Sequence, residues 1–139
     1  LLRLPMELHR DIIDYIKALE DKVCLRLACR YFMSIIKHPA QEDFLIAETR
    51  AFAIENNLYT CKYCGNFRHL LKFADNMRKG KRARHGVDAN TRFCVNCGVA
   101  HHLYTPGTEV TILGQLYVVC RLCGTFTDQV GAKGACSSC

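Results

Sequence analysis

The strongest constraint on this chain is a set of four Cys-x-x-Cys pairs in its C-terminal part, which contain eight of its ten cysteines. Two residues between cysteines let one tight turn present both sulfurs to a single metal ion. One such pair would also be typical of a redox site, but four of them outside any strand–helix–strand pattern favour structural zinc. We therefore predict two structural zinc ions, each bound by four thiolates. The pairs are Cys61/Cys64, Cys94/Cys97, Cys120/Cys123 and Cys136/Cys139.

The order of the pairs predicts which cysteines share an ion. Sequential pairing has the lowest loop-closure cost, but only by about 1–2 kcal/mol, so cross-braced and nested arrangements stay open. Residues 61–65, Lys72-Phe73 and 93–97 also resemble the single-zinc hairpin of phage recombination endonucleases. We predict site one from Cys61, Cys64, Cys94 and Cys97, and site two from Cys120, Cys123, Cys136 and Cys139. Four histidines could replace a cysteine ligand but are not needed, and we expect them at the surface: His69, His85, His101 and His102.

The cellular compartment follows from the same cysteines. Nothing in the sequence resembles a secretory signal peptide, and no apolar run reaches the roughly 18–20 residues that span a membrane. We therefore expect an intracellular protein, cytoplasmic or nuclear, without a membrane partner, whose thiols are reduced and bind metal rather than form disulfides. Because the sequence starts at Leu1 without an initiator methionine and stops on a cysteine, we expect it to be part of a longer protein.

The formal charge of +6 suggests an anionic partner. Eight thiolates that hold two divalent ions would lower it to about +2, since they add eight negative and four positive charges. Basic residues concentrate between the first two cysteine pairs, at Arg78, Lys79, Lys81, Arg82 and Arg84. We predict a flexible, solvated loop there. The alternatives are contact with nucleic acid, helped by nearby phenylalanines, or with an acidic protein target.

The spacing of cysteines divides the chain into a helical segment 1–38, a connecting segment 39–58 and a zinc-binding module 61–139. Apolar periodicity predicts helices over 5–19 and 21–32 and a short third turn that ends before Pro39.

The connecting segment is predicted to be one long helix over 40–57 that acts as a stiff arm. In the zinc-binding module, 109–113 and 115–119 flank Gly114 as a β-hairpin. The predicted fold class is therefore α+β: three helices and a helical arm, followed by a small β-rich module of the zinc-ribbon or zinc-knuckle kind.

An ordered set of residues near the N-terminus resembles the F-box, the helical module that docks on the Skp-type adaptor of cullin–RING ubiquitin ligases. The family pattern opens with Leu-Pro-x-Glu-Leu, continues with an aliphatic-rich helix and an acidic residue, and closes with a leucine and a Cys-Arg-x-Phe element. The matching residues are Leu4, Pro5, Glu7, Leu8, Ile12, Ile13, Ile16, Leu19, Glu20, Asp21, Leu25, Cys29, Arg30 and Phe32.

The resemblance implies that this segment binds a Skp-type adaptor and, through it, a cullin. Three short helices bury little surface, so a partner that covers their apolar residues is physically reasonable. Cys24 and Cys29 face too differently on one helix to share a metal ion easily, and we expect both to be small buried apolar residues. The residues implied to meet the adaptor, or to support the surface that does, are Leu4, Pro5, Leu8, Ile12, Leu25, Cys29 and Phe32.

The whole chain resembles the F-box-plus-cysteine-rich proteins of filamentous fungi, which share the pattern Arg92-Phe93-Cys-x-x-Cys-Gly98, then Tyr104-x-Pro-Gly107, then a valine-rich strand. No catalytic triad, carboxylate pair or phosphate-binding loop is evident, so we expect no enzyme. We predict a non-catalytic substrate receptor of a Skp–cullin–F-box ubiquitin ligase with an unidentified protein target. The alternatives are a nucleic-acid-binding zinc-ribbon protein that uses the basic loop 78–84, and an F-box protein that acts without a cullin.

Overall fold

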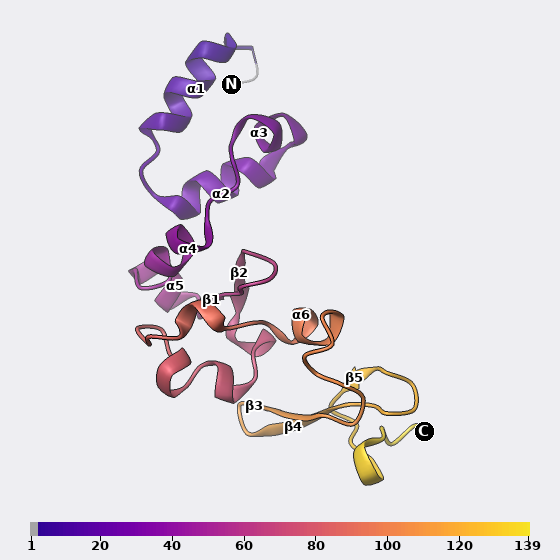
Figure 1. The fold of residues 1–139 in the computed structure, drawn as a ribbon. Helices are drawn as coiled ribbons and strands as arrows, with labels where there is room; N and C mark the ends of the chain where they lie inside the picture. Colours follow the sequence, from indigo (N-terminus) through magenta and orange to yellow (C-terminus); the bar gives the residue numbers. More distant parts are fainter. Residues whose placement is uncertain (1–2) are drawn as a thin grey trace.

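The computed structural model describes residues 3–139, which form a chain of helices followed by two small antiparallel sheets (Figure 1). The N-terminal unit contains α1 (Met6–Tyr15), α2 (Leu19–Ala28) and α3 (Arg30–Ile35). Its buried core is small and consists of Ile13, Phe32 and Ile36. No helix within residues 3–139 has the length and apolar character needed to cross a bilayer.

The second predicted helix is interrupted. At Cys29 the backbone is extended, with φ −161° and ψ 165°, so α2 ends there and α3 starts a new direction. This change of direction lets Phe32 and Ile36 pack with Ile13 of α1. The Tyr31 hydroxyl lies 2.6 Å from His9 Nδ1, which adds a polar contact between α1 and α3.

The connecting segment is not the single long helix that was predicted. It forms α4 (Gln41–Ala47) and α5 (Ala51–Glu55), because Arg50 between them has an extended backbone with φ −90° and ψ 163°. Glu48, which follows α4, is fully buried against the metal-binding part of the chain. The segment therefore packs on the first sheet rather than standing free as a stiff arm, and α4 lies beside β1 (Figure 1).

The first sheet is a hairpin of β1 (Leu58–Thr60) and β2 (Phe67–His69), and the first cysteine pair lies in the loop between them. Four short 3-10 turns follow over 70–72, 75–77, 80–82 and 89–91. A helix that the sequence did not predict, α6 (Val95–Ala100), begins directly after Cys94.

The predicted hairpin in the C-terminal part is confirmed. β3 (Glu109–Ile112) pairs with β4 (Gln115–Val119), and β4 also pairs with β5 (Phe126–Thr127). Leu113 and Gly114 at the turn both have positive φ, +50° and +78°, as a type I′ hairpin turn requires. The Asp75 carboxylate accepts hydrogen bonds from both of their amides, at 2.7 and 3.1 Å. It thereby fixes the hairpin turn to the 3-10 turn over 75–77.

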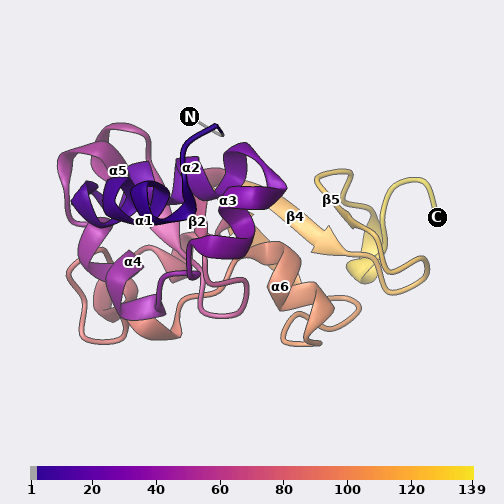
Figure 2. The same cartoon turned by 90° about the horizontal axis from the view of Figure 1, so that it is seen from above.

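The main hydrophobic core joins the first cysteine pairs to this hairpin. A separate small cluster near the C-terminus holds only Cys120, Ala135 and Cys136. Seen from above, the C-terminal segment extends beyond β4, away from α4 and α5 (Figure 2). The buried residues of the main core are Cys61, Phe73, Ala74, Met77, Cys94, Val95, Val110 and Ile112.

Candidate metal centres and the basic loop

The structure gathers eight cysteines into two groups of four. Within each group all four sulfur atoms lie within 4.8 Å of one another. Four sulfurs at 2.3 Å from a tetrahedral ion would be separated by about 3.8 Å, so each group is compact enough to hold one ion. The sequential pairing predicted from the sequence is the one the structure has. The groups are Cys61, Cys64, Cys94, Cys97 and Cys120, Cys123, Cys136, Cys139.

Two of the cysteine turns are built in the same way. Gly65 and Gly124, which follow the first and third pairs, have positive φ, +60° and +72°. Their amides donate to the carbonyls of Cys61 and Cys120, at 2.9 and 2.8 Å, and close each turn. A side chain would be strained at either position, which explains the Cys-x-x-Cys-Gly pattern.

Gly98 follows the second pair for a different reason. It lies inside α6, where a Cβ atom would come within 2.5 Å of the Tyr104 ring. Positive φ therefore accounts for glycine at positions 65 and 124, and close packing against a side-chain ring accounts for Gly98.

Hydrogen bonds prepare individual sulfurs to bind a cation. The Cys94 thiol, with further amide donors, lowers the pKa of Cys61 to about 4 despite burial. In the second group the amides of Cys123 and Cys136 lower the pKa of Cys120 to about 6. A thiolate rather than a thiol is the metal ligand, so each group contains one cysteine that is readily ionised.

The first group also contacts a cation of the protein itself. Arg68 Nε in β2 donates to Cys64 Sγ at 3.4 Å, and the thiolate in turn raises the pKa of Arg68. A guanidinium beside the group offsets part of the negative charge that four thiolates and one divalent ion would carry.

None of the four candidate histidines belongs to either cysteine group. His69, His85, His101 and His102 are all exposed, as expected. His69 accepts a hydrogen bond from the Leu71 amide, and His101 stacks on the Tyr63 ring with a centroid distance of 4.3 Å.

The basic loop is held by internal contacts, contrary to the flexible loop that was predicted. Arg78 forms an ion pair with Asp75, and Arg82 donates to the Thr91 hydroxyl at 3.3 Å. Arg84 donates to the carbonyls of Glu48 and Leu58 and lies over the Tyr59 ring. Lys79 and Lys81 alone among the five predicted contact residues are exposed.

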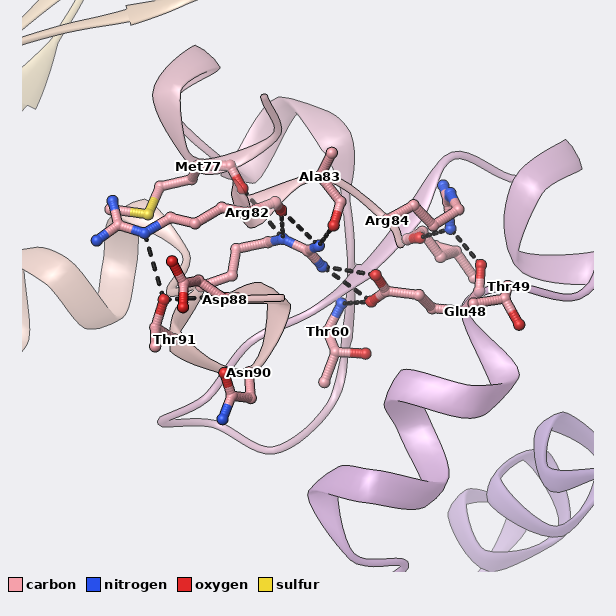
Figure 3. Close-up of polar contacts among 12 residues, drawn as sticks. Glu48, Thr49, Thr60, Met77, Arg82, Ala83, Arg84, Asp88, Asn90 and Thr91 are labelled. Carbon is pink, nitrogen blue, oxygen red and sulfur yellow. Dashed lines mark hydrogen bonds and ion pairs between the residues drawn. The ribbon is translucent and has the colours of Figure 1, made fainter. Parts of the chain in front are cut away.

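A buried ion pair that sequence analysis missed organises this loop (Figure 3). Arg92 is 0% exposed and forms hydrogen bonds at 2.8 and 2.9 Å with both carboxylate oxygens of Glu48. Glu48 also accepts from the Thr60 amide at 2.7 Å. The Arg92 guanidinium satisfies three loop carbonyls, those of Met77, Arg82 and Ala83.

Each residue of the ion pair is close in sequence to a different structural element. Arg92 lies two residues before Cys94 of the first group, and Glu48 follows α4. The two residues are 44 positions apart in the sequence, so no local pattern could have revealed the pair.

The residues that the F-box resemblance implies for adaptor binding differ in their exposure to solvent. Leu4, Pro5, Leu8 and Ile12 are exposed, while Leu25 and Cys29 are half-buried. Phe32 is buried in the small core and can only support a surface.

The two N-terminal cysteines also differ from each other. Cys24 is exposed, so the prediction that it is buried is wrong, because α2 turns this face to solvent. Cys29 is half-buried against the core of the N-terminal unit.

Comparison of the chain with protein-family models, with curated proteins and with solved structures found no match.

Proposed function

We propose that this chain is a non-catalytic receptor subunit of a Skp–cullin–F-box ubiquitin ligase, in which the N-terminal helices bind the adaptor and two zinc ions stabilise the C-terminal module. The observation that carries the adaptor proposal is the apolar surface of α1. Met6, Leu8 and Ile12 of α1 are large apolar residues that remain exposed, as is Leu4 just before the helix. Water-exposed apolar side chains grouped on one short helix are typical of a surface that a partner covers.

The small size of the N-terminal core supports the same proposal. The buried apolar residues there are Ile13, Phe32 and Ile36, with the polar His9 beside them, so little apolar area stabilises the three helices. A partner that buries the exposed face of α1 would add the missing apolar contact.

The donor sets support zinc as the metal. Four thiolates in a compact group form a closed tetrahedral site, which is typical of structural zinc and leaves no position for a substrate. The ion supplies a cross-link that the small core around Cys120 and Cys136 could not replace. In this proposal the chain accelerates ubiquitylation only by holding a target near the ligase, which raises the target's effective concentration.

The experiment that tests adaptor binding uses two leucines of similar exposure. Leu8 is 46% exposed on α1, and Leu71 is 51% exposed between the cysteine pairs. The zinc-loaded chain is co-expressed with a Skp-type adaptor and captured through a tag. We expect Leu8→Asp to abolish adaptor capture and Leu71→Asp to preserve it. Capture that survives in Leu8→Asp, or no capture by the unchanged chain, would reject the proposal, and cullin in the captured complex distinguishes a ligase from an adaptor–receptor pair alone.

The nucleic-acid alternative has less support from the described contacts. Three of the five basic residues in its proposed surface, Arg78, Arg82 and Arg84, are engaged inside the protein. Two exposed lysines would give a shallow dependence of binding on salt. Binding to duplex and single-stranded oligonucleotides at increasing salt measures that dependence.

A further inference from the structure

Helices α2 and α4 are in contact (Figure 1), and a groove of about 720 Å³ that the predicted sites do not use lies beside them. Its walls come from the segment before α2, the start of α2, the segment between α3 and α4, and α4 itself. The volume is in the range of sites that receive a few side chains, and is too small for a folded domain.

The rim of this groove is strongly basic. Four cationic side chains line it, and none forms an ion pair within residues 3–139. The one carboxylate in the lining, Asp43, already accepts the Ala40 amide at 3.1 Å. An anionic ligand would therefore meet unpaired positive charge there. The cations are Lys17, Lys22, Lys37 and Arg50.

Apolar residues also line the groove. They include Leu19, Pro39 and Ile46, and Ile46 is 59% exposed. An exposed isoleucine surrounded by unpaired cations suits a ligand that presents an apolar side chain between negative charges.

The lining also distinguishes a peptide from a nucleic acid. No phenylalanine, tyrosine or tryptophan lines the groove, whereas single-stranded nucleic acid is bound largely by stacking of bases on such rings. Three of the four cations are lysines, which act as point charges and do not offer the paired donors that arginine presents to phosphate. Carboxylates are therefore the better match.

We propose that this groove binds an acidic peptide segment in which an apolar residue lies between aspartates or glutamates. The apolar residue packs on Ile46, and the carboxylates face the lysines of the rim. This docking surface is separate from the exposed apolar residues of α1, so it does not depend on the proposal that α1 binds an adaptor.

The test measures binding of a fluorescein-labelled peptide, with leucines between aspartates and glutamates, to the zinc-loaded chain at low salt. We expect binding that weakens as salt increases. Replacement of the peptide's leucines by serine, or of its acids by their amides, should each reduce affinity about tenfold or more. Failure of the original peptide to bind at low salt would overturn the proposal.

The matched variants reverse two charges each. Lys22→Glu/Lys37→Glu changes the rim, and Lys72→Glu/Lys133→Glu changes two exposed lysines elsewhere. We expect the first to weaken peptide binding about tenfold or more and the second to leave it nearly unchanged. Equal loss in both would show a general charge effect and reject the groove.

Three further measurements keep the outcome specific. Ile46→Ser removes the exposed isoleucine of the groove without changing charge, and we expect it to weaken binding while zinc content stays the same. An unlabelled oligonucleotide that displaces the peptide more effectively than unlabelled peptide would overturn the assignment to a peptide. Leu8→Asp should bind the peptide normally, which separates this surface from the adaptor surface.

Discussion

The two cysteine groups contain the same ligands on related turns, yet they lie in different surroundings. In the first group Cys61 and Cys94 are buried and Cys64 and Cys97 half-buried, and the group forms part of the main hydrophobic core. In the second group Cys123 and Cys139 are exposed, and only Ala135 packs with the buried cysteines.

Because of this difference, a bound ion would contribute differently to the stability of the two regions. Around the first group, core packing and the Arg92–Glu48 pair already bring distant segments together, so an ion would complete a fold that other contacts also support. Around the second group few other contacts hold the chain, so an ion would supply most of the local order.

The largest expected effect comes from removing one ligand of each group. Cys61→Ser should release one zinc ion and strongly destabilise the main core, because a structural site contributes about 10–16 kcal/mol of apparent binding free energy, but core packing and the Arg92–Glu48 pair should keep its distant segments together. Cys123→Ser should release one zinc ion and disorder only the segment around 120–139. Zinc content and amide NMR spectra measure both results, and widespread spectral change in Cys123→Ser would break the comparison.

A smaller effect is expected from the buried ion pair. Glu48→Gln leaves the Arg92 guanidinium buried without its counter-charge, which should lower the free energy of unfolding of the region around the first cysteine group by about 3–5 kcal/mol. Chemical denaturation of the zinc-loaded chain measures this loss. Glu42→Gln, at an exposed position on α4, is the control and should change little. Equal stability of the two variants would mean that the ion pair does not support the core.

The smallest effect concerns the contact between Asp75 and the turn of the β3–β4 hairpin. Asp75→Asn removes a charged acceptor from the turn amides of Leu113 and Gly114 and should cost about 1–3 kcal/mol. Partial burial raises the pKa of Asp75, but the amides of Gly114 and Leu113, and Arg78, together lower it below its ordinary value. The contribution is therefore complete at neutral pH and is lost only as the pH falls below about 4.

Denaturation at neutral pH measures the Asp75 effect, with Asp128→Asn at an exposed position as the control. Protection of the β3–β4 amides from hydrogen exchange should also fall in Asp75→Asn. If hairpin protection is unchanged, the hairpin is held mainly by Val110 and Ile112, which pack in the main core.

Local sequence patterns predicted the parts of the structure that depend on neighbours in the chain. The Cys-x-x-Cys-Gly turns follow from spacing and from the positive φ of Gly65 and Gly124. The β3–β4 hairpin follows from strand-forming residues around Gly114. Helix α6 was missed because its six residues include a cysteine and a glycine of a metal-binding pattern.

Contacts between distant residues account for what the sequence did not predict. The interval from 40 to 57 has helix-forming residues throughout, but the burial of Glu48 against Arg92 accompanies a break before α5. The basic loop looked solvated because its arginines gave no sign of carbonyl and aromatic partners elsewhere in the chain.

The separation between Glu48 and Arg92 has a consequence for synthesis. The two residues are 44 positions apart. Because translation adds about 5–20 residues per second, Arg92 is synthesised a few seconds after Glu48. During that interval the ion pair cannot complete the packing of α4 on the first sheet. A nascent chain of this kind therefore carries Glu48 as an unpaired carboxylate until Arg92 has been added.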